Sequence, residues 1–182
     1  FVVCSTGEMF TLSQDEMVET VEVAVISADD RIPIVGGLPF PDVERKVEVA
    51  KRYESVGAAG GVALLPFESP SDDDTIYEHY ARLADKVKIP LLIYEHPRWQ
   101  STHLLTPVLV SRLAATGRYF GMKDCTGDLL RLTAMADAGK GQFGVMQAVQ
   151  EQLLSALACG STGACATASN AYPHLYRRLY DT

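Results

Sequence analysis

The chain has 182 residues, of which 47% are apolar and 21% charged, and its formal net charge is -7. This length suits one well-packed domain spanning residues 1–182, and the composition is that of an ordinary soluble globular protein. The negative charge argues against a nucleic-acid or anionic-membrane surface, and no apolar run approaches the ~20 residues that a membrane span requires.

Short apolar runs alternate along the chain with segments of helical period. Within each run nearly every residue is apolar, with no alternation of apolar and polar residues, which indicates parallel strands that are buried on both faces. In chain order, the expected strands are Phe1–Cys4, Ile32–Gly36, Gly61–Pro66, Pro90–Tyr94, Tyr119–Lys123, Gln142–Met146 and Gly163–Ala166.

Recognisable start signals open several of the intervening helices. Ser13 with Glu16 reads as a capping box, and Ser71 with Asp74 repeats the pattern. Pro107 follows Thr106 at a first helical position. The expected helices are Met17–Ala28, Pro41–Val56, Ile76–Val87, Pro107–Ala115, Asp128–Ala138, Glu151–Ala158 and Tyr172–Tyr180.

Repeated strand–helix units admit an open doubly wound sheet or a (β/α)8 TIM barrel. The first strand is not followed by the GxGxxG of a dinucleotide-binding sheet, so the barrel is favoured. A barrel closes with eight strands and the sequence shows seven, the first of which opens the chain at Phe1. Because an unclosed barrel exposes two strand edges, we expect the first strand–helix unit to lie upstream of the supplied chain.

Two reactive side chains close apolar strands, where functional groups of such barrels gather. They are Lys123 and Tyr94. An apolar pocket is expected to lower the pKa of Lys123, and Gly121 beneath it is expected to leave space around its stem. A free amine attacks a ketone to form an imine, and the phenol of Tyr94 is a candidate proton shuttle for that chemistry.

The hydroxyl-rich turn Ser5-Thr6-Gly7 is a candidate site for a substrate carboxylate, because hydroxyl and backbone N–H groups at a strand end bind anions. A metal-dependent lyase built on acidic side chains, and a barrel that binds a 2-oxo acid without turnover, remain alternatives. Glu95 and Asp124, two of these acids, are expected to point outward if their neighbours Tyr94 and Lys123 point in. We therefore expect no metal and no cofactor.

Four stretches in collinear order resemble one known family over essentially the whole chain. They read STGEMFTLSQDE, IYEHP, GMKDCTGD and GACATASN. Together they are similar to the dihydrodipicolinate synthase/N-acetylneuraminate lyase family of Schiff-base, pyruvate-handling class I aldolases. The resemblance implies a (β/α)8 barrel whose first strand–helix unit and C-terminal helical extension are not in this chain.

The resemblance also implies a role for each matching position. Lys123 would be the imine-forming residue and Tyr94 the proton relay. Ser5, Thr6 and Gly7 would bind the substrate carboxylate, and the backbone near Cys165 would line the pocket. The implied activity is a lyase, aldolase or dehydratase, acting on pyruvate, a related 2-oxo acid or a 2-keto-3-deoxy sugar acid.

The family resemblance further suggests a cytoplasmic homo-oligomer, a dimer or a tetramer of paired dimers. Scattered cysteines without a CxxC pair agree with reduced thiols in the cytosol, and Cys4 and Cys165 are expected to be buried. Two positions depart from the synthase pattern. Glu68 follows Phe67 where an aromatic pair is usual, and Trp99 stands where lysine-pathway members have an arginine. Lysine biosynthesis is therefore not the favoured function.

Overall fold

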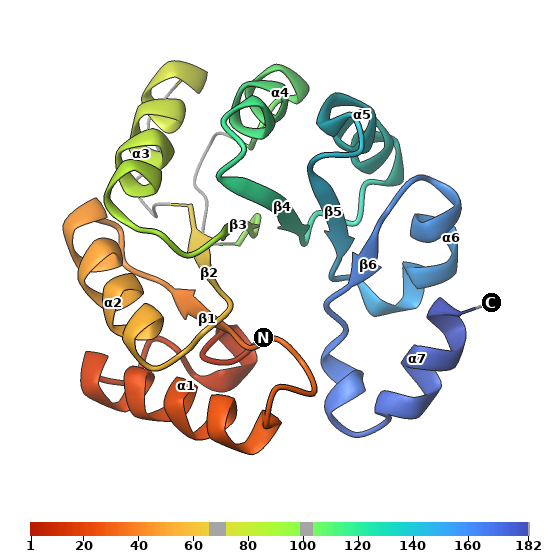
Figure 1. The fold of residues 1–182 in the computed structure, drawn as a ribbon. Helices are drawn as coiled ribbons and strands as arrows, with labels where there is room; N and C mark the ends of the chain where they lie inside the picture. Colours follow the sequence, from red (N-terminus) through yellow and green to blue (C-terminus); the bar gives the residue numbers. More distant parts are fainter. Residues whose placement is uncertain (66–71, 99–103, 182) are drawn as a thin grey trace.

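The computed structural model describes residues 1–65, 72–98 and 104–181. One six-stranded parallel sheet runs in the order β1-β2-β3-β4-β5-β6, so each strand pairs with the next along the chain. The sheet curves around a centre and the helices cover its outer side (Figure 1). The strands are β1 (Val35–Leu38), β2 (Gly60–Leu64), β3 (Leu91–Glu95), β4 (Tyr119–Asp124), β5 (Gly144–Gln147) and β6 (Gly163–Ala164).

The helices follow the strands in alternation, as the sequence pattern predicts. The α-helices are α1 (Gln14–Ala28), α2 (Val43–Ser55), α3 (Asp73–Lys86), α4 (Pro107–Ala115), α5 (Leu129–Gly139), α6 (Leu153–Ala158) and α7 (Pro173–Tyr180), with short 3-10 helices η1 (Ser5–Gly7), η2 (Gln150–Gln152) and η3 (Thr167–Asn170). Within the described ranges, none of these helices is both long and apolar enough to cross a membrane.

Burial on both faces explains the continuous apolar strands. Every residue of β2 and of β3 is buried, because one face of each strand meets the centre of the ring and the other meets the helices. The prediction of two-sided burial is therefore confirmed for these central strands.

The predicted first strand, Phe1–Cys4, is wrong in its extent. Only Val2 pairs, through an isolated parallel bridge with Gly36. Val3 adopts a left-handed backbone with φ of 53°, and the chain then turns into η1. A Cβ on Gly37 would lie 1.7 Å from the Val3 carbonyl oxygen, so glycine permits this close approach.

Other boundaries shift by a few residues for local reasons. β1 begins at Val35 rather than Ile32, where Ile32 is exposed and Pro33 lacks the N–H that a ladder needs. The ladder of β6 ends at Ala164, although the Cys165 amide still donates to the Gln147 carbonyl at 2.8 Å.

Helix caps agree with the sequence at most starts. The Ser13 hydroxyl accepts from the Glu16 amide and the Glu16 carboxylate accepts from the Ser13 amide, which completes the predicted capping box. Thr106 caps α4 with Pro107 in the first turn. The cap of α3 is Asp72, one residue later than predicted, and Ser71 lies outside the described residues.

A buried lysine that the sequence pattern did not single out ties α2 to the sheet. Lys46 is fully buried, and its Nζ donates to the Leu64 carbonyl at 2.6 Å and meets His79 Nε2 at 2.8 Å. Burial lowers the pKa of Lys46 to about 7. Burial, with Lys46 as the next cause, lowers the pKa of His79 to about 3, so at neutral pH its ring is uncharged and Nε2 accepts the lysine hydrogen.

This lowered pKa makes folding stability depend on pH. The unfolded chain holds the Lys46 proton up to pH ~10.4, whereas the folded chain releases it near pH 7, so stability from this group is lost as pH falls from 10 to 7. We predict that the free energy of unfolding of Lys46→Met, relative to that of wild type, is higher at pH 7 than at pH 10. The difference should be roughly 1.4 kcal/mol for each unit by which folding lowers the Lys46 pKa.

Urea unfolding of both proteins across that pH range measures the difference. Lys51→Met on the same helix, at an exposed position, is the matched control and should show little trend. A difference between wild type and Lys46→Met that stays constant with pH would contradict the prediction.

Candidate active site

The two predicted reactive side chains lie directly opposite each other on adjacent strands. Tyr94 of β3 and Lys123 of β4 are register partners, and their side chains are 1% and 7% exposed. Lys123 Nζ lies 4.1 Å from the centroid of the Tyr94 ring. Side chains alternate across a strand, so both project into the ring of strands while the residues after them project outward.

Gly121 has a different role from the predicted one. It was expected to leave space around the lysine stem, two residues below Lys123. A Cβ on Gly121 would instead lie 2.3 Å from the Gly144 carbonyl oxygen, so the glycine permits the close approach of β4 and β5.

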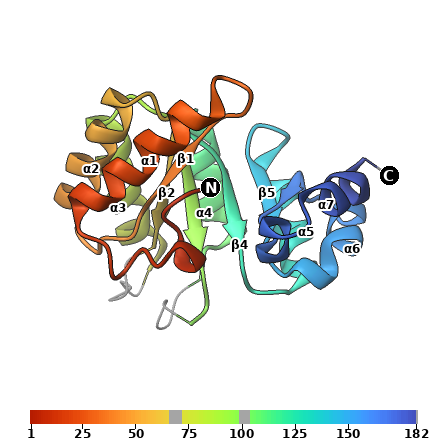
Figure 2. The ribbon, with the colours of Figure 1, turned by 90° about the horizontal axis from the view of Figure 1, so that it is seen from below.

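The N-terminal turn lies at the same end of the ring. Strand arrowheads point toward one end of the molecule, and the η1 turn lies there (Figure 2). The hydroxyl oxygens of Ser5 and Tyr94 are 3.0 Å apart and share a hydrogen bond. The Cys4 carbonyl accepts from the amides of Gly7 and Met9, which fixes the turn beside Tyr94.

A cavity of about 170 Å³ joins the N-terminal turn to Lys123 and to the last strand. Thr6 and Cys165, both predicted from the sequence, line it, whereas Gly7 is exposed and is not among the lining residues. The lining residues are Phe1, Cys4, Thr6, Lys123, Ala164, Cys165, Ala166, Thr167, Ser169 and Asn170.

The charge state of Lys123 differs from the prediction. Burial of the amine lowers its pKa, but the anionic forms of Tyr94 and of three neighbouring thiols raise it by more, so the pKa of Lys123 lies above its ordinary value. The thiols belong to Cys125, Cys165 and Cys4. The expected lowering is therefore wrong, and in the free site Lys123 is an ammonium ion that lies over the face of the Tyr94 ring.

The acids around the amine are themselves protonated at neutral pH. Burial raises the pKa of Cys125 to about 12 and that of Cys165 to about 11. Burial also raises the pKa of Tyr94, against the opposing effect of the Lys123 charge. Cys4 is buried and Cys165 partly buried, and the thiols of all four cysteines are free.

Behind the reactive pair, Glu95 and Asp124 are also register partners, and both are fully buried. They face outward toward α5, as predicted, and Arg131 forms ion pairs with both at 2.6 and 3.4 Å. In the described part of the chain, no group of three His, Cys, Asp or Glu side chains is arranged to hold a metal ion.

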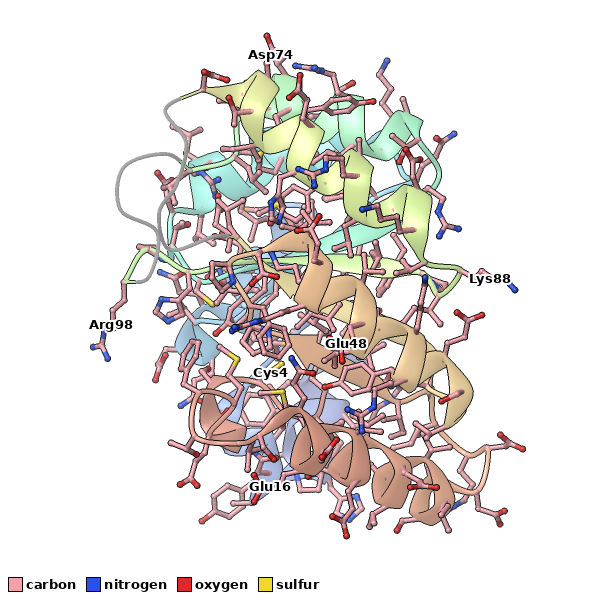
Figure 3. All side chains as sticks on the ribbon, turned by 90° about the vertical axis from the view of Figure 1, so that its left-hand side faces the viewer. Cys4, Glu16, Glu48, Asp74, Lys88 and Arg98 are labelled. Carbon is pink, nitrogen blue, oxygen red and sulfur yellow. The ribbon has the colours of Figure 1, made fainter. Side chains whose placement is uncertain are left out.

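Arg131 was not identified from the sequence. The available signal was an arginine in the first turn of the helix that follows the Lys123 strand, where a side chain can reach back over the strand end. Phe67, Glu68 and Trp99, the predicted departures from the synthase pattern, lie outside the described residues. Arg98 points away from the ring at the end opposite Lys88 (Figure 3).

An ordered parallel ladder with outer helices and polar groups at the carboxyl ends of its strands is TIM-barrel architecture. The sequence model of the Dihydrodipicolinate synthetase family matches residues 1–182. The chain belongs to this family. It spans about 60% of the length of the curated relatives that it matches.

Known proteins resemble the chain in both sequence and fold. A 4-hydroxy-tetrahydrodipicolinate synthase of Archaeoglobus fulgidus is 28% identical over 177 residues, which are 97% of this chain and 60% of that protein. The dihydrodipicolinate synthase of Acinetobacter baumannii, solved with pyruvate, is 28% identical with a TM-score of 0.91 over 97% of this chain and 60% of that one. A prophage protein of the family from E. coli K12, also solved with pyruvate, is 25% identical with a TM-score of 0.92 over 100% and 62% of the respective chains.

The electrostatics of the free site give a direct prediction. The midpoint of the Lys123 titration should lie above the ordinary value, and Tyr94→Phe should lower it because that change removes the phenolate charge that raises the pKa. Reductive 13C-methylation followed by NMR titration measures the midpoint, and the signal lost in Lys123→Ala assigns it. A midpoint that rises in Tyr94→Phe would contradict this account of the site.

Proposed function

We propose that this protein is a Schiff-base-forming lyase, an aldolase or dehydratase, that acts on pyruvate, a related 2-oxo acid or a 2-keto-3-deoxy sugar acid. The observation that carries the proposal is the buried pair near the strand ends. The Lys123 amine lies 4.1 Å from the centroid of the Tyr94 ring, and the Tyr94 hydroxyl shares a hydrogen bond with Ser5. Membership of the family, and two relatives solved with pyruvate, support the same assignment.

Lys123 is proposed to form the imine. The ammonium ion of the free site first gives up a proton, and the neutral nitrogen then attacks the ketone carbon. A C–N bond forms, the ketone oxygen takes up two protons and leaves as water, and the nitrogen remains joined to the former carbonyl carbon. The iminium then draws electrons from the adjacent carbon, which is what carbon–carbon cleavage or loss of water requires.

Tyr94 is proposed to move the protons of this sequence. The amine lies 4.1 Å from the centroid of the Tyr94 ring, and the hydroxyl of that ring shares a hydrogen bond with Ser5, so a proton can pass along the two hydroxyls. The raised pKa of Tyr94 keeps the phenol protonated in the free site, ready to donate.

The surrounding turn is proposed to bind the substrate carboxylate. Ser5 and Thr6 supply hydroxyl groups, Gly7 completes their turn, and Thr6 and Cys165 line the cavity. The ammonium charge of Lys123 attracts the same carboxylate before the amine loses its proton. No metal and no cofactor take part in this scheme.

We propose that residues 1–182 belong to a single (β/α) barrel domain and that the protein is a cytoplasmic homo-oligomer, a dimer or tetramer. Free thiols suit a reducing compartment. The exposed apolar side chains of Tyr172, Leu175 and Tyr180 on or beside α7 suit contact between subunits.

Trapping with borohydride tests the imine. Incubation with pyruvate and borohydride should give a stable adduct on the peptide that carries Lys123, and Lys123→Ala should give none. Lys88→Ala, at an exposed lysine before β3, is the matched control and should trap as wild type does. Absence of an adduct with every 2-oxo acid tried, together with activity that a chelator abolishes, would favour a metal-dependent lyase instead.

The phenol is tested separately. Tyr94→Phe should lower turnover by about 100-fold, the usual contribution of a general acid–base group, while leaving imine trapping largely intact. Ser5→Ala should have a turnover between that of wild type and that of Tyr94→Phe, because it removes the hydrogen-bond partner of the phenol but not the phenol. Steady-state rates beside trapping yields give the comparison, and an unchanged rate in Tyr94→Phe would remove Tyr94 from its role.

A further inference from the structure

One guanidinium joins three separate segments at the carboxyl end of the sheet. Arg131 of α5 pairs with Glu95 at the end of β3 and with Asp124 at the end of β4. Its Nη2 also donates to the Leu105 carbonyl at 2.8 Å, just before α4. Its side chain is only 15% exposed, so these contacts are largely shielded from water.

Leu105 is held on both sides by the same cluster. Its amide donates to Glu95 Oε1 at 2.6 Å while its carbonyl accepts from Arg131. The second oxygen of Glu95 lies 2.6 Å from Arg131 Nη2 in an ion pair that is shielded from water. The start of α4 is thereby fixed to the end of β3.

The two carboxylates are the immediate chain neighbours of the reactive pair. Glu95 follows Tyr94 and Asp124 follows Lys123, and both couples are register partners in the β3–β4 ladder. Any slip or twist between the strand ends that moved Glu95 relative to Asp124 would move the Tyr94 ring relative to the Lys123 amine. We call the ion pairs of Arg131 with Glu95 and Asp124 the clamp. By fixing these two carboxylates, the clamp also fixes Tyr94 relative to Lys123.

Asp124 is anchored independently. Its Oδ1 accepts from the Thr126 amide at 2.9 Å and its Oδ2 from the Thr126 hydroxyl at 3.1 Å, whereas its distance to Arg131 is longer, at 3.4 Å. Glu95 has no such local turn, so Arg131 and Leu105 are its anchors in the described residues. Of the two ion pairs of Arg131, the one with Glu95 therefore matters more for the position of its carboxylate.

We propose that Arg131 and Glu95 are positioning residues that set the alignment of Tyr94 with Lys123 for the proton transfers of the reaction. This inference rests on the proposed function. Neither residue touches the cavity that Lys123 lines, so they act through the strand ends and not on the substrate.

The charge state of Glu95 gives the clamp a pH dependence. Burial raises the pKa of Glu95 to about 7, against the lowering effects of Arg131 and the Leu105 amide. The other groups that face it are Asp124 on β4 and the buried Tyr80 of α3. Above pH 7 the ionised carboxylate holds Arg131; below pH 7 the neutral acid holds it less strongly, and alignment weakens.

Two variants test the inference in the 182-residue chain. Arg131→Lys keeps the positive charge, but a single ammonium group cannot reproduce the separate contacts of the guanidinium nitrogens with Glu95, Asp124 and the Leu105 carbonyl. Glu95→Gln keeps an oxygen that accepts from the Leu105 amide but removes the negative charge. Both should trap pyruvate with borohydride within about threefold of wild type, while turnover falls about 10- to 100-fold, as expected of a small misalignment. Arg112→Lys, which makes the same change at an exposed ion pair with Asp74, is the matched control and should turn over as wild type does.

The pH profile supplies the readout that a purely structural role would not give. The ratio of wild-type to Glu95→Gln turnover should rise with pH through 7, because the variant resembles the protonated wild type at every pH. Titration of Lys123 itself is common to both proteins and cancels in the ratio.

The outcomes are distinct. Turnover of both variants equal to that of Arg112→Lys, or a ratio independent of pH, overturns the inference. If Arg131→Lys does not fold, Glu95→Gln alone decides by the same two measurements. A wild type that traps no 2-oxo acid overturns the proposed function itself, and the positioning roles with it.

Discussion

The register between β3 and β4 is the constraint on which the site depends. Because these parallel strands pair residue for residue at their carboxyl ends, Tyr94 stands opposite Lys123 and Glu95 opposite Asp124. The alternation of side chains along a strand then separates the two pairs, placing the phenol and amine inside the ring and both carboxylates outside it. One backbone ladder therefore builds a reactive pair and the ionic cluster behind it.

The two buried lysines of the structure have pKa values shifted in opposite directions. Among the described residues, Lys46 meets two neutral acceptors, the Leu64 carbonyl and the His79 ring, and burial lowers its pKa toward neutrality. Lys123 is also buried but is surrounded by acids whose anionic forms would stabilise its charge, and its pKa is raised. Burial alone therefore does not predict the state of a lysine; the groups that face its nitrogen decide the direction.

The chain belongs to the Dihydrodipicolinate synthetase family, and behind the reactive pair at its strand ends lies the cluster of Glu95, Arg131 and Leu105. Acceptors and donors within the cluster come from β3, α5 and the segment before α4. Segments that lie far apart in the chain thus share one guanidinium. This arrangement is costly to bury but resists displacement once formed, because removing one partner would leave an unpaired charge.

The sequence by itself determined the alternation of strands and helices, most helix starts and the two reactive residues near the strand ends, because apolar periodicity, capping side chains and strand parity are local properties. It did not determine that Phe1–Cys4 pairs at a single residue, which depends on a left-handed turn at Val3 against Gly37. Tertiary structure alone decided the direction of the Lys123 pKa and the convergence of Arg131 on Glu95. Both arise from groups distant in sequence that meet only when the ring of strands forms.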